Sequence, residues 1–152
     1  RFGESLDQDM VAIPLGPPQR FVVVGSPAYL KQAGRPSDPR ELSRHRCIRI
    51  RFPSGARYRW EFEKAGEKLE VDVAGPLEVG EMPLMLRAAE DGLGLAYVYA
   101  ETARASLSAG RLETVLDDWR PPEAGFFLYY PSRRLPPAGL QKFIELVKES
   151  RT

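Results

Sequence analysis

The chain has 152 residues, which is long enough for one domain or two small lobes with a hydrophobic core. Hydrophobic residues make up 43% of it and charged residues 28%, and the formal net charge is +1. Nucleic-acid binders usually concentrate basic charge on one face, so this near-neutral balance argues against tight DNA binding by these residues alone. The single cysteine, Cys47, excludes an internal disulfide and favours a reducing compartment, and we expect a cytoplasmic protein.

Apolar runs, helix-start signals and turn residues alternate along the chain and predict its elements. In chain order these are strands at 10–15 and 20–25, a helix from Ser26 to Gly34, a short helix over 40–44, strands at 47–52, 58–63, 69–73 and 77–79, a helix over 82–90, a strand at 95–99, a helix over 100–109, strands at 112–116 and 126–130, and a last helix after Pro137. No apolar run approaches the length of a membrane span, so no membrane partner is expected. Strands that alternate with helices around a hairpin-rich insert predict an α/β fold.

The segment from Leu84 to Tyr99 is the most informative part of the sequence. The spacing of Leu84, Met85 and the two alanines after them predicts a helix with one buried side. Gly92 stands where a helix end favours a left-handed residue, and Gly94 allows the chain to turn closely against a neighbour. The following residues, up to Tyr99, predict a buried strand.

The sequence contains no recognisable catalytic constellation. His45 has no nucleophile in a known motif beside it, and the pair His45 and Cys47 is short of the three or four ligands that a metal site needs. Gly92 and Gly94 lack the third glycine and the preceding strand of a dinucleotide site. We therefore expect no catalytic residue, no metal and no cofactor, and we do not expect an enzyme.

The segment 79–83 is the best candidate for a binding site from the residues alone. Gly80 permits close backbone approach, and the free N–H groups of a helix start near Pro83 favour an anion such as a ligand carboxylate. Glu81 could instead cap the helix, or select a cationic or hydroxylated ligand, and a plain helix start explains the same residues. Tyr97 and Tyr99 share one face of a strand, where they either line a pocket or pack in the core.

Several segments, in order and spacing, closely resemble the ligand-sensing domain of LysR-type transcriptional regulators. They are Arg1-Phe2-Gly3-Glu4, the run from Phe21 to Leu30, Leu42-(x2)-His45-(x)-Cys47-Ile48, Trp60-Glu61-Phe62, the run from Leu84 to Tyr99, Gly110-Arg111-Leu112 with Asp117-Asp118-Trp119, and the run from Leu128 to Arg134. The resemblance implies a type II periplasmic-binding-protein-like fold with two lobes joined by two crossover strands, at 21–25 and 95–99. It assigns 1–22 and 99–152 to the first lobe and 23–98 to the second. The first lobe is expected to be incomplete and to expose apolar surface, because the block that opens the family's sensing domain is absent from this sequence, as is the winged helix-turn-helix.

The resemblance also implies a ligand site between the lobes and a role in regulation. The residues expected there are Arg1, Phe2, Ser26, Arg49, Arg51, Gly80, Glu81, Met82, Tyr97 and Tyr99. The expected function is that of a small-molecule-sensing and oligomerising domain, with a carboxylate as one candidate ligand, in a homodimer or homotetramer that contacts DNA only through the missing N-terminal domain. A solute-binding protein of a transport system shares the fold and is the alternative.

Overall fold

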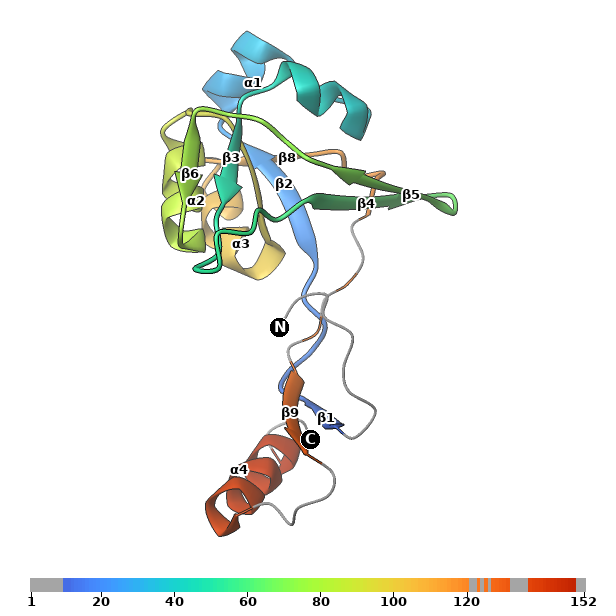
Figure 1. Cartoon of the computed structure of the whole chain (residues 1–152). Coiled ribbons are helices and arrows are strands. Elements are labelled where there is room, and N and C mark those ends of the chain that lie inside the picture. The colour runs from blue at the N-terminus through green and yellow to red at the C-terminus, as the bar shows by residue number, and fades with distance from the viewer. Residues whose placement is uncertain (1–9, 121–122, 124, 126, 132–136, 150–152) are drawn as a thin grey trace. The chain divides into compact units, whose positions relative to one another are not determined.

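The computed structural model describes residues 10–120, 123, 125, 127–131 and 137–149 (Figure 1). It divides into two compact units, a larger one of Arg20–Glu123 and a smaller one made of Arg1–Gln19 and Ala124–Thr152. The first boundary is close to the expected one after residue 22. The second lies later than the expected boundary before residue 99, because the next helix and strand pack within the larger unit.

The larger unit is built on a five-stranded sheet in the order β6-β3-β7-β2-β8. Its strands are β2 (Phe21–Gly25), β3 (Cys47–Ile50), β6 (Leu77–Val79), β7 (Leu95–Tyr99) and β8 (Glu113–Val115). β3 runs parallel to β6 and β7, whereas β2 runs antiparallel to β7 and β8. Both expected crossover strands, at 21–25 and 95–99, are therefore interior strands of this sheet.

Two helices cover one face of the sheet, α2 (Met82–Glu90) and α3 (Ala100–Ser108) (Figure 1). The core between them and the sheet consists of apolar side chains, including Val24, Ile48, Val98 and Met85. Met85 is 1% exposed, whereas Leu84 is 55% exposed. The prediction that Leu84 lies on the buried side of α2 is thus wrong.

A hairpin of β4 (Trp60–Lys64) and β5 (Glu67–Val71) contributes the packing partners of the opposite face. Trp60 and Phe62 of the hairpin are buried, and their rings pack on Tyr97 of β7 with centroids 5.3 and 5.9 Å apart. The hairpin therefore covers the face of the sheet opposite the helices with aromatic side chains.

Local signals explain why the chain turns where it does. Ser26 caps α1 (Pro27–Ala33), its Oγ accepting a hydrogen bond from the backbone N–H of Tyr29 at 3.1 Å. Asp38 caps the short 3-10 helix η1 (Pro39–Arg44) in the same way. After α2, Gly92 has a φ of +79°, which confirms the left-handed position expected from the sequence.

The smaller unit contains the antiparallel pair β1 (Met10–Pro14) and β9 (Phe127–Pro131) and the helix α4 (Ala138–Glu149). Phe127 of β9 and Phe143 and Leu146 of α4 are 41, 47 and 56% exposed. Among the described residues, no helix is long and apolar enough to cross a membrane.

Candidate functional site

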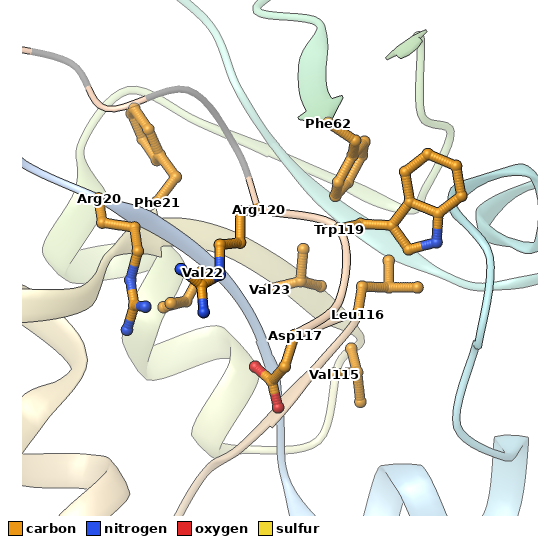
Figure 2. A pocket seen from close by; sticks show the side chains of 10 residues that line it. All are labelled: Arg20, Phe21, Val22, Val23, Phe62, Val115, Leu116, Asp117, Trp119 and Arg120. Atoms are coloured by element: carbon orange, nitrogen blue, oxygen red, sulfur yellow. The ribbon is translucent and has the colours of Figure 1, made fainter. Parts of the chain in front are cut away.

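A small cavity of the larger unit has a volume of about 20 Å³ (Figure 2). It lies beside β2 and β8, and Figure 2 shows Phe62, Trp119 and Arg120 among its lining side chains. A cavity needs roughly 10–15 Å³ to hold one water molecule. This space can hold about one water and is too small for a metabolite.

Two wider grooves lie elsewhere on the larger unit. One of about 420 Å³ follows the β4–β5 hairpin, between Glu61 and Glu70. The other, of about 440 Å³, lies between the start of α1 and the end of α2 and is lined by Ser26, Arg87 and Arg111, among others. Neither groove is lined by the residues predicted at the ends of β3, β6 and β7.

The sheet direction brings most of the predicted site residues to one edge. β3, β6 and β7 are parallel, so their carboxyl ends lie at the same edge. This edge contains Arg51 after β3, Gly80 to Met82 after β6, and Tyr99, the last residue of β7, before α3. The backbone N–H of Arg51 donates to the carbonyl of Val79 at 2.9 Å, which ties the ends of β3 and β6 together. We call this set the carboxyl edge. In open α/β sheets, ligands bind outside the carboxyl ends of the strands.

The starts of α2 and α3 both lie at the carboxyl edge. Their N-cap residues, Glu81 and Tyr99, form no side-chain cap hydrogen bond, so Glu81 does not take the capping role considered from the sequence. A helix start carries partial positive charge, and two of them at one edge favour a negatively charged group. A Cβ atom at Gly80 would meet nothing within 4 Å, so the space beside this backbone position is open.

Arg49 and Arg51 both interact with Glu78, which neighbours them on β6. Arg49 lies 2.7 Å and Arg51 3.5 Å from the Glu78 carboxylate, and only Arg51 has a mostly exposed side chain. Arg51 is therefore the more accessible of the two.

The two predicted tyrosines occupy different environments. Tyr97 is 3% exposed, its ring stacks on Phe21 with centroids 4.5 Å apart, and its hydroxyl donates to the carbonyl of Glu61 at 3.0 Å. Burial raises the pKa of Tyr97 well above its usual value. Tyr99 also stacks on Phe21, at 4.3 Å, but is partly exposed. Tyr97 is thus a core residue, while Tyr99 belongs to the edge.

Ser26 does not share this edge. It follows β2, which is antiparallel to β7, with Val24 opposite Ala96 near the start of β7. It is buried, and a Cβ atom at Gly92 would lie 3.5 Å from its Oγ. Ser26 therefore caps a helix at the opposite edge of the sheet. Arg1 and Phe2 lie outside the described residues.

His45 and Cys47 have structural roles in this arrangement. The His45 Nδ1 and the Tyr29 hydroxyl are 3.0 Å apart, and desolvation lowers the pKa of His45, opposed by Glu41. Burial raises the pKa of the Cys47 thiol to about 12, which keeps it protonated and unreactive at neutral pH. In the described part of the chain, no group of three metal-ligating side chains comes together.

Sequence reasoning missed two residues at the carboxyl edge, Glu78 and Arg57. Glu78 pairs with Arg49 in the β3–β6 register. The backbone of Arg57 forms an isolated antiparallel β-bridge with that of Arg51. The turn residues between Arg51 and Arg57 could have suggested that the two arginines meet across a hairpin-like loop. The partner of Glu78 depends on strand register, which no local pattern contains.

Known proteins resemble this chain over its whole length. The family model of the LysR substrate binding domain matches residues 1–152. The HTH-type transcriptional regulator PgrR of Escherichia coli K12 is 34% identical over 97% of the chain, and the HTH-type regulator YcaN of the same strain is 36% identical over 94%. These matches cover 50% of PgrR and 46% of YcaN, so the chain spans about half the length of these curated relatives.

Solved structures confirm the fold. The full-length virulence activator AphB of Vibrio cholerae superposes with a TM-score of 0.79 at 22% identity, covering 97% of this chain and 50% of that one. The regulatory domain of CrgA, a LysR-type transcriptional regulator from Neisseria meningitidis, gives a TM-score of 0.75 at 22% identity, covering 100% and 74%. The regulatory domains of these proteins have the type II periplasmic-binding-protein-like fold expected from the sequence. The chain belongs to the LysR substrate-binding domain family.

Proposed function

We propose that this chain is the small-molecule-sensing and oligomerising domain of a LysR-type transcription regulator. The family match over residues 1–152 carries the proposal, since relatives above 30% identity bear the name of HTH-type regulators. In this proposal, DNA is bound by a separate helix-turn-helix domain and not by these residues. The formal net charge of +1 supports that division of labour.

The proposed effector site is the carboxyl edge. Arg51, Glu81, Met82 and Tyr99 provide its accessible groups, with Gly80 between the strand and the helix. The two helix starts and Arg51 give this edge positive character, which supports an anionic effector such as a carboxylate. Arg49 and Tyr97 have structural roles at this edge.

An effector regulates transcription only if it binds two conformations of the protein with different affinity. In the proposed mechanism, binding at the carboxyl edge favours one arrangement of the sensing domain. The oligomer then changes the spacing of the DNA-binding domains, as rigid-body switches do.

A thermal-shift screen of metabolites on the complete protein tests the proposal. A ligand that binds only the folded state raises the melting temperature. The same ligand should change expression from a promoter that the protein controls. A ligand that alters solute uptake but leaves transcription unchanged would contradict the proposal and favour a transport component with the same fold.

A further inference from the structure

Three arginine side chains surround the single carboxylate of Glu78 at the carboxyl edge. The Glu78 oxygens lie 2.7 Å from Arg49 Nη2, 3.5 Å from Arg51 Nε and 3.3 Å from Arg57 Nε. One negative charge thus faces three positive charges. These four side chains together have a formal charge of +2.

The burial of these side chains separates an inner pair from an outer pair. Arg49 and Glu78 are 19 and 21% exposed, whereas Arg51 and Arg57 are 57 and 52% exposed. The inner pair largely neutralises itself, because these two groups are the closest and the least hydrated. The excess positive charge therefore lies on the outer arginines, at the surface.

The outer arginines keep donor groups available. Both contact Glu78 through Nε, and among the described residues neither side chain forms another ion pair or side-chain hydrogen bond. Their terminal amino groups are thus open to a further acceptor. A guanidinium presents such donors in a planar fork that matches the oxygens of a carboxylate or phosphate.

The inner pair is also incompletely satisfied. Arg49 Nε is buried and has no hydrogen-bond partner in the described part of the chain, whereas Glu78 Oε1 lies 2.7 Å from Arg49 Nη2 and 3.3 Å from Arg57 Nε. Buried charged groups usually have such partners, and an exception calls for an explanation. Arg49 Nε is such an exception.

We propose that Arg51 and Arg57 form an anion subsite for a carboxylate or phosphate group of the effector. Glu78 is its internal counter-ion: it holds the two guanidinium groups side by side, and it also competes with the bound anion for them. Arg49, the inner arginine, offsets most of the negative charge of Glu78. This inference rests on the proposed function and specifies the chemical class of ligand at that site.

Isothermal titration calorimetry on the complete protein tests the subsite, with inorganic phosphate and succinate as separate probes at constant ionic strength. The neutral analogue succinamide controls for interactions that do not need charge. Wild-type protein should bind at least one of the two anions. Binding of phosphate alone would assign a phosphate group and binding of succinate alone a carboxylate, and both results support the subsite. The absence of binding by either anion would overturn it.

Charge-removing variants separate the subsite from a general surface effect. The double variant R51Q/R57Q should weaken anion binding by about tenfold or more, because charge-assisted hydrogen bonds are lost. The control R59Q removes an arginine of similar exposure, 64%, that pairs with Glu70, and should change the affinity by less than about twofold. Equal affinity in the wild type and the double variant would refute the subsite. If the double variant fails to fold by circular dichroism, R57Q alone provides the same comparison.

The variant E78Q tests the role of the internal counter-ion in the opposite direction. Removing its negative charge should strengthen anion binding, whereas a purely structural ion-pair network predicts unchanged or weaker binding. An effector that controls transcription equally well in R51Q/R57Q would refute the subsite and leave the proposed function standing. Arginine-dependent anion binding without any effect on transcription would refute the proposed function and leave the subsite standing.

Discussion

His45 is the only histidine of the chain, and its ring joins α1 to the segment before β3 through a hydrogen bond with Tyr29. The neutral ring can accept a hydrogen bond from the Tyr29 hydroxyl at Nδ1, and that hydroxyl in turn accepts one from the backbone N–H of Arg46 at 3.0 Å. Protonated His45 cannot accept at Nδ1 but can donate from it to the hydroxyl oxygen, so protonation reverses the direction of this hydrogen bond.

We expect acidification to destabilise the fold through His45. Desolvation, opposed by Glu41, lowers the pKa of His45 in the folded state, so the unfolded chain binds the proton more readily. The resulting stability is present above the usual pKa near 6.5 and is lost as the pH falls through the lower folded value. Urea unfolding at pH 7.5 and 5.5 should show a larger loss in the wild type than in His45→Gln. An equal loss in both proteins would contradict the assignment.

At the scale of the element, α2 has two adjacent residues with opposite environments. Met85→Ala should destabilise the protein by about 2–5 kcal/mol, because it opens a cavity in the core between α2 and the sheet. Leu84→Ala is the matched control, since Leu84 is 55% exposed, and should change the free energy of unfolding by less than about 0.5 kcal/mol. Urea unfolding of both variants measures the difference. A similar loss in both would place Leu84 in the core after all.

The turn between α2 and β7 contains two glycines that differ in their tolerance of a side chain. At Gly92 the φ is +79° and a Cβ atom would meet only Ser26 Oγ at 3.5 Å, so Gly92→Ala should cost about 1 kcal/mol of left-handed strain. At Gly94 the φ is +155° and a Cβ atom would lie 2.3 Å from the backbone oxygen of Arg46. Gly94→Ala should therefore cost about 3 kcal/mol or more in thermal or urea unfolding. The reverse order of the two variants would show that the turn rearranges.

Local patterns predicted the elements well and their placement less well. The Ser26 cap, the left-handed Gly92 and the buried strand before Tyr99 are properties of a few neighbouring residues, and the structure confirms them. The direction of a strand is not such a property. The sequence could not show that β2 runs against β7, which places Ser26 at the edge opposite Arg51.

The same reason explains the missed residues and the later boundary. The role of Glu78 depends on the β3–β6 register, and the inclusion of α3 in the larger unit depends on its packing near β7. Leu84 was misplaced because an apolar helix spacing does not show how far the sheet extends beneath the helix. These features are set by non-local packing.

At the scale of the whole molecule, we predict that the complete sensing domain is a homodimer. An isologous pair uses the same patch on both subunits, as most small symmetric assemblies do. Sedimentation equilibrium across a wide concentration range should give the mass of a dimer. A monomer at the highest concentration would contradict this prediction, and a tetramer would extend it.

The pairing of β2 with β8 has a consequence for how the larger unit is connected. The chain enters this unit at Arg20 and, after β8, reaches Arg120; both residues line the small cavity of Figure 2. The backbone N–H of Glu63 further fixes the Arg120 carbonyl at 3.1 Å. Its two connections therefore emerge next to each other, as in an inserted domain. The larger unit should therefore fold as an autonomous polypeptide of residues 20–120 with a cooperative unfolding transition by circular dichroism.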